Sequence, residues 1–416
     1  MSASRTISIL ILASLLITAC TAAVPPEGGN SPTPVAEIEG EEESPEEESA
    51  APSAAASACQ DPFEGSSPQF PTRYWEKTNF CKHSVDYDEI FSGGPPPDGI
   101  PAIDEPEFIS PEEADQWLED VEPVISFQVG NDARAYPLQI MTWHEIVNDT
   151  VGELPVVVTF CPLCNTALVF ERPEVQGQRL TFGTSGMLRK SDLVMYDRQT
   201  ESWWQQFTGE AIVGDLTGPQ LEFLPAVITS WEDFQKTFPD GKVLSRDTGY
   251  NRSYGRNPYP GYDDVNNTPF AFAEEPANGE IRPMERVVGV ILEEGDAASY
   301  LLSRLMEEKV VNDRLGGSPI TIFWKAGTAS ALDSSQIPLG KDVGTSAVFL
   351  AEVGDQILTF SANEEGGFVD EETGSTWDIF GQAVDGPLEG SELTQIPHYS
   401  TFWFAWSAFE KADPPQ

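Results

Sequence analysis

The chain has few cysteines, few histidines and few basic residues for its length. Its 416 residues include five cysteines, three histidines and 23 lysines and arginines, against 68 aspartates and glutamates. The formal net charge is −45, so neither nucleic acid nor an anionic membrane surface is expected as a partner. The simplest consequence of this charge is a soluble surface that repels other copies of itself.

Several well-defined catalytic signatures are also missing. The stretch 183–187 (GTSGM) does not complete the G-x-S-x-G pattern of serine hydrolases. No P-loop and no dinucleotide-binding glycine pattern occurs, so no nucleotide cofactor is expected. A second C-x-x-C pair is absent as well, which excludes a closed zinc knuckle.

Only one long apolar run occurs, Ile7–Ile17, which follows Arg5 and precedes the sequence TAC ending at Cys20. The run is too short to span a bilayer comfortably. With its basic start and small residues before a cysteine it resembles a bacterial lipoprotein signal peptide, residues 1–20, with Cys20 as the lipidated residue. We therefore expect an exported protein, held to the membrane by lipid and facing the extracytoplasmic side. An ordinary cleaved signal, with Cys20 incidental, is the alternative.

Two segments separate this signal from the main part of the chain. Residues 21–58 are rich in Pro, Ser, Ala and Glu and have few large apolar side chains, which predicts a disordered acidic tether. Residues 59–118 contain Cys59 and Cys81, for which we predict a disulfide because exported proteins fold in oxidising compartments.

The rest of the chain contains an internal repeat. Residues Val124–Leu168 align without a gap on Val288–Leu332, and Trp204 further on matches Trp377. The shared order and spacing predict two homologous units from an internal duplication, in a pseudo-twofold arrangement. The units span 119–245 and 284–411, and a linker rich in Tyr, Asn and Pro, 246–283, joins them. A lid function for this linker is a further possibility.

The hydrophobic patterns predict a fold that is mainly β with short helices (α+β). One helix is expected over Leu138–Val147, ended by Asn148, Asp149 and Gly152. Strands are expected at Val124–Val129, Arg134–Tyr136, Pro155–Phe160, Ala167–Glu171, Leu180–Gly183, Leu193–Asp197 and Ala211–Val213.

Two thiols stand out at the end of the expected strand Pro155–Phe160, in the sequence VTFCPLCNTA. The second unit has Lys325 and Thr328 where the first has Cys161 and Cys164. His144, on the expected helix before this strand, likewise has no histidine counterpart. The joint difference fits one site in the first unit, with the helix bringing the imidazole near the thiols.

Three interpretations of the thiol pair remain open. In the first, Cys161, Cys164 and His144 bind a Zn or Cu ion, with Glu145, Glu201, Met187 or water as the fourth ligand. In the second, the pair is a redox-active dithiol of a thiol-disulfide oxidoreductase, although the residues that follow favour a strand over the required helix. In the third, the pair is a structural disulfide in a non-catalytic surface binding protein.

Whether the chain is an enzyme stays open at this point. Glu201, Glu145 and Asp197 are the candidate catalytic carboxylates. Asp197 has a counterpart in Asp370, which favours a structural role, whereas Glu201 has none.

Several motifs together resemble an uncharacterised prokaryotic family, domain of unknown function 3179 (DUF3179). They are WHEIVND, PVVVTFCPLCNTA, FGTSGML, LVMYDRQTESWWQQ and FWFAW, and the resemblance covers about residues 134–409. It implies membership of that family and no particular activity. The hallmark motifs map onto His144, Glu145, Cys161, Cys164, Ser185, Gly186, Asp197, Glu201, Trp204 and Gln205.

Overall fold

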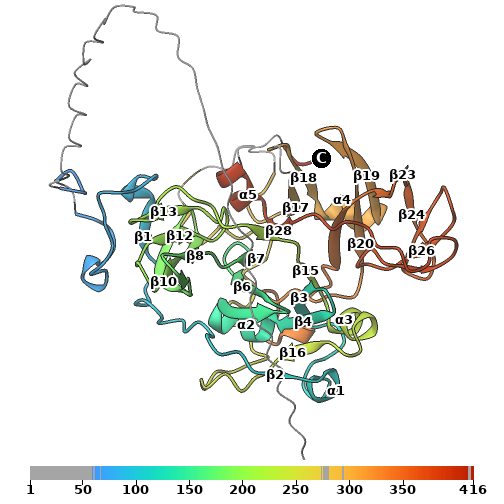
Figure 1. The fold of residues 1–416 in the computed structure, drawn as a ribbon, viewed down its shortest axis with the longest axis horizontal. Helices are drawn as coiled ribbons and strands as arrows, with labels where there is room; N and C mark the ends of the chain where they lie inside the picture. Colours follow the sequence, from blue (N-terminus) through green and yellow to red (C-terminus); the bar gives the residue numbers. More distant parts are fainter. Residues whose placement is uncertain are drawn as a thin grey trace, which may run out of the picture. The chain divides into compact units, whose positions relative to one another are not determined.

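The described part of the chain is mainly β-sheet with short helices, as the sequence predicts (Figure 1). The computed structural model describes residues 59, 61–65, 67–272, 274, 281–292, 295–410 and 414–416. The expected signal peptide with Cys20 and the expected tether, 21–58, lie outside the described residues. The described residues belong to one compact unit that begins at Cys59, and none of their helices has the length and apolar character needed to cross a membrane.

The thiol pair lies at the end of a four-stranded sheet. Its strands, in spatial order, are β14 (Phe223–Leu224), β7 (Thr166–Glu171), β6 (Leu154–Cys161) and β5 (Ile146–Val151). The last six residues of β6 are all buried. A strand with such a continuous apolar run is covered on both faces, so this sheet is an internal layer that delivers Cys161 to the interior.

Two five-stranded sheets flank this layer in the first half of the chain. One has the order β1 (Ile90–Ser92), β10 (Phe182–Arg189), β11 (Asp192–Asp197), β12 (Trp203–Gln205) and β13 (Ala211–Val213). The other has the order β15 (Val227–Ser230), β3 (Pro123–Val129), β4 (Asp132–Pro137), β16 (Lys242–Leu244) and β2 (Phe108–Ile109). The hairpin β8 (Glu174–Val175) and β9 (Gln178–Arg179) and the helices α1 (Pro111–Ala114), α2 (Leu138–His144), α3 (Trp231–Thr237), η1 (Thr72–Tyr74) and η2 (Tyr87–Glu89) complete this half.

The second half of the chain also consists of small sheets, with fewer strands. Its sheets are β18 (Ala297–Leu301), β17 (Arg286–Ile291) and β28 (His398–Phe402); β19 (Val310–Leu315), β20 (Ser318–Lys325) and β21 (Thr345–Leu350); and β24 (Phe360–Ala362), β25 (Phe368–Asp370), β26 (Thr376–Trp377) and β27 (Ala383–Asp385). The hairpin β22 (Glu352–Val353) and β23 (Gln356–Ile357) and the helices α4 (Leu302–Glu308), α5 (Trp403–Glu410) and η3 (Ile337–Leu339) complete it. Between β16 and β17, the described residues form no helix or strand.

The helix expected over Leu138–Val147 is shorter than predicted. Helix α2 ends at His144, because Glu145 takes a left-handed conformation with a φ of 60°. Such a residue closes a helix, and the β-branched residues that follow favour a strand. Asn148 and Asp149, expected to end the helix, therefore lie within β5, and Asn148 pairs with Val157 of β6.

Corresponding elements of the two halves share local geometry. Helices α2 and α4 have the same length, and each follows a residue with φ −61° and ψ 131°. In the first half, Trp204 Nε1 donates a hydrogen bond of 3.0 Å to Asp197 Oδ2. In the second, Trp377 Nε1 donates to Asp370 Oδ2 over the same distance. These contacts show that the residues matched by the sequence repeat occupy equivalent local positions.

The two halves also contact each other through two pairs of threonines. The hydroxyl groups of Thr166 on β7 and Thr401 on β28 lie 2.9 Å apart. Those of Thr345 on β21 and Thr229 on β15 lie 3.2 Å apart. Strands β7 and β28 lie side by side in Figure 1, which places the thiol-bearing layer against the second half of the chain.

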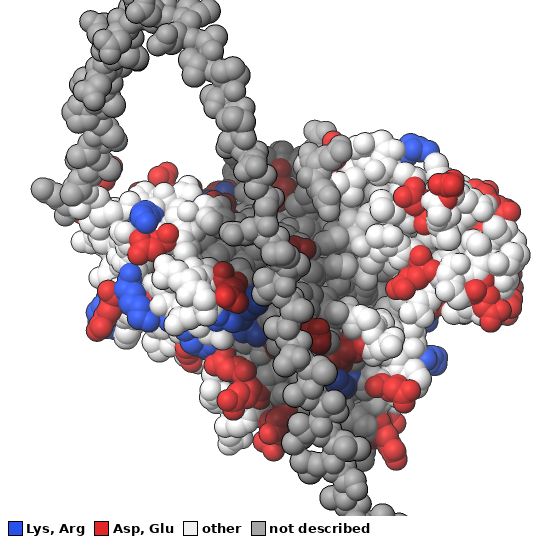
Figure 2. Space-filling model, in the orientation of Figure 1, with Lys and Arg blue, Asp and Glu red and all other residues white. Residues whose placement is uncertain are grey.

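The N-terminal segment and the surface of the described part of the chain agree with two expectations from the sequence. A disulfide joins Cys59 and Cys81, as predicted. On the parts of the face in Figure 2 that are not covered by grey atoms, acidic side chains are widespread and basic ones are fewer, in line with the net charge of −45.

Candidate functional site

The two thiols lie in a tight turn between β6 and β7. Cys161 is the last residue of β6 and pairs with Thr166, the first of β7. Pro162 begins the connection, and Asn165 ends it in a left-handed conformation with a φ of 55°, both common choices for such turns. The Phe402 amide donates a hydrogen bond to the Cys164 carbonyl oxygen, so the second half of the chain holds this turn in place.

A third donor comes from another sheet, at the hairpin between β10 and β11. Lys190 and Ser191 form its two-residue turn, and both have positive φ values, 52° and 67°. Two-residue hairpins of this type need positive φ at both positions, which costs energy for side chains other than glycine. The turn places Asp192, the first residue of β11, beneath the thiols, and the Cys164 sulfur lies 3.7 Å from the Ser191 carbonyl oxygen.

Together these residues form a compact donor cluster. A sulfur from each of Cys161 and Cys164 and a carboxylate oxygen of Asp192 all lie within 4.8 Å of one another. All three residues are buried, and both cysteines are free thiols. Asp192 Oδ2 accepts hydrogen bonds from Gln205 and from the Phe207 amide. Asp192 Oδ1 is buried and accepts no hydrogen bond from an N–H or O–H group of the described residues, so the neighbouring Cys161 and Cys164 thiols are the donors that interact with this carboxylate.

The protonation of the cluster follows from its burial. Burial raises the pKa of Cys161 and raises that of Cys164 well above its usual value. Burial also raises the pKa of Asp192 to about 6, against the opposing effect of the Gln205 hydrogen bond. The pKa of nearby Glu145 rises to about 8 through burial and through the charge of Asp192. Without a cation, the two thiols and Glu145 are therefore neutral at pH 7.

A pocket of about 330 Å³ lies beside this cluster. Its lining includes Glu145, Leu163 from the turn between the two cysteines, and Leu193, which follows Asp192. These three residues connect the pocket directly to the donor cluster. The volume is at the lower end of the range for small-molecule sites, so the pocket suits a compact ligand.

One wall of the pocket comes from the linker between β16 and β17. Tyr259, Tyr262 and Phe270 line the pocket. The Tyr262 hydroxyl donates a hydrogen bond of 3.1 Å to the Leu163 carbonyl oxygen and accepts one from the Phe270 amide. The linker is thus fixed onto the thiol-bearing turn. Phe270 is half exposed, which places it at the rim.

The opposite wall comes from the segment before the first unit. Pro95 and Ile100 line the pocket. Gly186 on β10 has a φ of 75°, and a Cβ there would lie 2.0 Å from the Pro95 carbonyl oxygen. Only glycine therefore permits this close approach.

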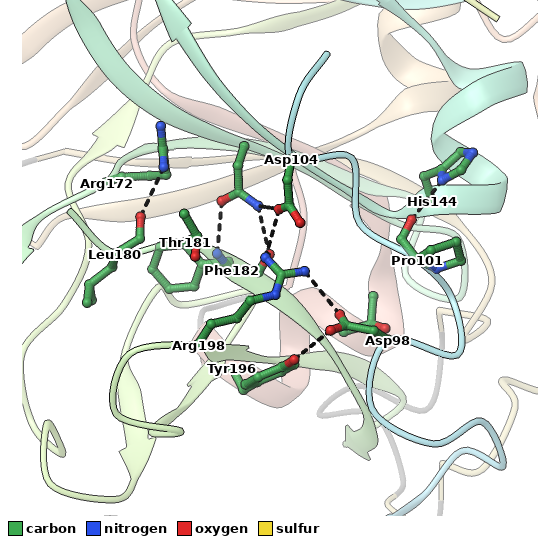
Figure 3. Close-up of polar contacts among 12 residues, drawn as sticks. Asp98, Pro101, Asp104, His144, Arg172, Leu180, Thr181, Phe182, Tyr196 and Arg198 are labelled. Atoms are coloured by element: carbon green, nitrogen blue, oxygen red, sulfur yellow. Dashed lines mark hydrogen bonds and ion pairs between the residues drawn. The ribbon is translucent and has the colours of Figure 1, made fainter. Parts of the chain in front are cut away.

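A set of polar contacts fixes this segment onto the sheet (Figure 3). Arg198 forms ion pairs with Asp98 and Asp104, and the Tyr196 hydroxyl donates a hydrogen bond of 2.6 Å to Asp98. Asn148 donates a hydrogen bond to Asp104. These contacts hold both ends of the stretch that contains Ile100, so the pocket wall is set by the fold.

The structure does not bring His144 to the thiols. One ring nitrogen of His144 lies 2.7 Å from the Pro101 carbonyl oxygen, as Figure 3 shows. The other lies 2.6 Å from the Tyr254 hydroxyl. Burial lowers the pKa of His144, so the ring is neutral. In the cluster, the third donor is Asp192, in the position that the sequence analysis gave to His144.

The three candidate catalytic carboxylates have clearly different surroundings. Glu145 lines the pocket. Asp197 accepts hydrogen bonds from Thr200 and Trp204, as Asp370 does from its counterparts, which fits a structural role. Glu201 accepts a hydrogen bond from the Lys77 amide, and it ties the N-terminal segment to the sheet. Met187, a possible fourth ligand, lines the pocket, and Ser185 donates a hydrogen bond to the Val194 carbonyl oxygen.

Sequence reasoning missed Asp192 and the tyrosines of the linker. Asp192 directly precedes the expected strand Leu193–Asp197 and the family motif LVMYDRQTESWWQQ that begins with it. A carboxylate at the start of a buried strand is a signal that could have drawn attention to it. No local pattern marks Tyr259 or Tyr262, because the linker has no periodicity.

Comparison with known proteins gives one match. Searches of curated proteins and of solved structures return no match. The family model described as "Protein of unknown function (DUF3179)" matches residues 97–413, a range that contains the donor cluster, the linker and the pocket lining apart from Gly93 and Pro95. The chain is therefore a member of the DUF3179 family.

Proposed function

We propose that Cys161, Cys164 and Asp192 bind one Zn or Cu ion. The observation that carries this proposal is the donor cluster, in which a carboxylate oxygen of Asp192 and the sulfurs of Cys161 and Cys164 lie within 4.8 Å of one another and all three residues are buried. In the metal-free protein the two thiols, which are weak donors, are the groups that interact with the remaining face of the Asp192 carboxylate, and a metal ion held by all three would replace these weak contacts. Thiolate ligands favour Zn or Cu over Mg or Ca.

The proposed set of metal ligands would allow catalysis at the ion. Three protein ligands leave the fourth position of a tetrahedral zinc site open, as in catalytic zinc sites. A bound ion of this kind supplies Lewis acidity or a more acidic water. Glu145 is the carboxyl group that lines the adjoining pocket, so it is the residue placed to hold or move a proton there.

The redox interpretation has weaker support. Redox-active cysteines need a lowered thiol pKa, whereas burial raises the pKa of Cys161 and Cys164. The residues after Cys164 form strand β7 and not a helix, so no helix N-terminus lies at the thiols to lower their pKa.

Metal analysis tests the proposal. The protein, carrying Cys20→Ser so that only Cys161 and Cys164 are free thiols, is purified without added metal and analysed for Zn and Cu. One equivalent is expected, lost in Cys161→Ser/Cys164→Ser and reduced in Asp192→Asn. Asp215→Asn, at an exposed carboxylate, serves as the matched control and should retain the metal.

Thiol titration of the same samples separates the alternatives. Metal-free protein with no titratable thiol in denaturant would indicate a structural disulfide between Cys161 and Cys164. A metal-free protein with two titratable thiols and an oxidising potential would indicate a dithiol oxidoreductase. Either result would overturn the metal proposal.

We also propose that the protein is exported and anchored to a membrane by lipid on Cys20. The N-terminal sequence pattern supports this location, and so does the Cys59–Cys81 disulfide, because such bonds persist in oxidising compartments. Incorporation of labelled fatty acid, absent in Cys20→Ala, would test it. Recovery of the wild-type protein in the soluble fraction without lipid would contradict it.

The two halves of the fold, we infer, descend from one duplicated unit in a pseudo-twofold arrangement. The equal helices α2 and α4 and the reciprocal threonine contacts support this origin. Superposition of an experimental structure of residues 119–245 on 284–411 tests it. A common connectivity over β3–β7 and β17–β21, related by a rotation near 180°, is the expected result.

A further inference from the structure

The pocket beside the donor cluster contains an unpaired carboxylate. Glu145 is only 6% exposed, and its carboxylate makes no hydrogen bond or ion pair with any residue in the described part of the chain. It nevertheless lines the pocket. A buried polar group without a partner is destabilising, so a ligand in the pocket is the natural source of that partner.

The rest of the pocket lining is mainly aromatic and apolar. The lining includes three aromatic residues, Tyr259, Tyr262 and Phe270, and three apolar ones, Met187, Leu188 and Leu193. No Lys, Arg or His belongs to the described lining. An anionic ligand such as a phosphate or carboxylate would therefore enter without any positive partner.

Charged groups next to the pocket make the electrostatic potential inside it more negative. Asp192 lies close enough to Glu145 for their charges to interact, and so does Cys161. A divalent ion held by two thiolates and one carboxylate leaves the centre with a net negative charge. Aromatic rings attract organic cations. Glu145 is neutral in the empty pocket at pH 7, and above its pKa of about 8 it adds a direct charge partner.

We propose that this pocket binds a small organic cation, an alkylated ammonium whose apolar body packs on Tyr259 and Tyr262 and whose charge lies next to Glu145. This inference rests on the proposed function in taking the metal centre as the negative group beneath the pocket. The volume of about 330 Å³ limits the ligand to a compact molecule.

Two molecules of similar shape and different charge test the inference. They are choline and its uncharged isostere 3,3-dimethylbutan-1-ol, which carry the same hydroxyl group, so any contact of that group with the metal is equal in both. Calorimetric titration of the metal-loaded full chain at pH 9, above the Glu145 pKa of about 8, is expected to give a Kd for choline at least about tenfold below that of the alcohol.

Matched variants locate the binding in the pocket. Glu145→Gln keeps the size of the side chain and is expected to weaken choline about tenfold or more, because a charge partner is lost, while binding of the alcohol stays unchanged. Tyr259→Leu is expected to weaken choline, and Tyr259→Phe, which keeps the aromatic face, is not.

The metal content of every sample separates this inference from the metal proposal. Metal-loaded protein that binds the alcohol as well as choline, or binds neither, overturns the organic-cation inference and leaves the metal centre standing. Protein that contains no metal but prefers choline, with the loss in Glu145→Gln, overturns the metal proposal and supports the cation site. Unchanged choline affinity in Glu145→Gln with normal thermal stability overturns the role of Glu145.

Discussion

The Gln205 side-chain amide donates a hydrogen bond of 2.6 Å to Asp192 Oδ2. The Phe207 amide donates a second, of 2.9 Å, to the same oxygen. Because Oδ2 accepts both of these hydrogen bonds, Oδ1 accepts none from an N–H or O–H group in the described structure. Gln205 is therefore a positioning residue, which fixes the carboxylate beneath Cys161 and Cys164 without belonging to the donor cluster.

Gln205→Leu is expected to weaken metal binding by about 10- to 100-fold, the usual effect of removing a hydrogen bond to a ligating residue. Competition with a chelator of known affinity measures the change. Gln220→Leu, at an exposed glutamine, is the control and should bind metal as the wild type does. Equal affinities in the two variants would show that Gln205 does not position Asp192.

His144→Leu is expected to retain the metal but to lose stability. The substitution leaves the Pro101 carbonyl oxygen and the Tyr254 hydroxyl without their shared partner, at a cost of about 1–3 kcal/mol. Metal analysis and denaturant unfolding of the same preparation give both quantities. A folded His144→Leu protein that had lost its metal would reinstate histidine as a ligand.

Metal binding at pH 7 is expected to release about two protons per ion, because both sulfurs must bind as thiolates. Burial raises the pKa of both thiols, so they are protonated at pH 7 in the metal-free protein. Affinity should then rise about 100-fold per pH unit near neutrality. Below the pKa of Asp192, about 6, protonation of this carboxylate weakens binding further.

Calorimetry in two buffers with different ionisation enthalpies counts the released protons. Cys161→Ser is the matched variant and should release one proton fewer if it binds at all. A pH-independent affinity would contradict thiolate ligation.

The buried carboxyl group of Glu122 is expected to make the stability of the protein depend on pH, independently of the donor cluster. Its carboxylate is buried and accepts hydrogen bonds from Gln139 and the Glu119 amide, and burial raises its pKa to about 7. Between pH 4.5 and 7 the folded protein keeps a proton that the unfolded chain gives up, so the free energy of unfolding falls as pH rises. Above pH 7 Glu122 is ionised in the folded protein as well, and the reduction in the free energy of unfolding is then largest.

Glu122→Gln removes this ionisation. Its Tm relative to the wild type is expected to be more favourable at pH 8 than at pH 5, as measured by calorimetric melts at both values. Glu153→Gln, at an exposed position, is the control. A difference in Tm that does not change with pH would show that Glu122 does not titrate in this range.

Local sequence patterns predicted much of the fold, and their failures have identifiable causes. Strands β6, β7 and β13 lie where β-branched and apolar residues were expected to form them. The helix before β5 was overextended, because the apolar pattern of Ile146 and Val147 suits a strand as well as a helix. The left-handed conformation of Glu145 decides between the two.

The candidate site was predicted only in part. The sequence located Cys161, Cys164 and Glu145, since the first two share one turn and the third ends a nearby helix. It paired them with His144, the neighbour along the chain, whereas the structure pairs them with Asp192, the neighbour across sheets. Both ring nitrogens of His144 have partners of their own, which no local pattern reveals.

The sequence by itself determined the β-rich composition, the thiol turn and the acidic surface, because each depends on residue type and local spacing. Only the tertiary structure decided which carboxylate joins the thiols and which tyrosines enclose the pocket. The reason is physical: the thiols, Asp192 and the linker belong to separate elements. Their meeting depends on how two sheets and an irregular segment pack together, and not on the conformational preference of any one of them.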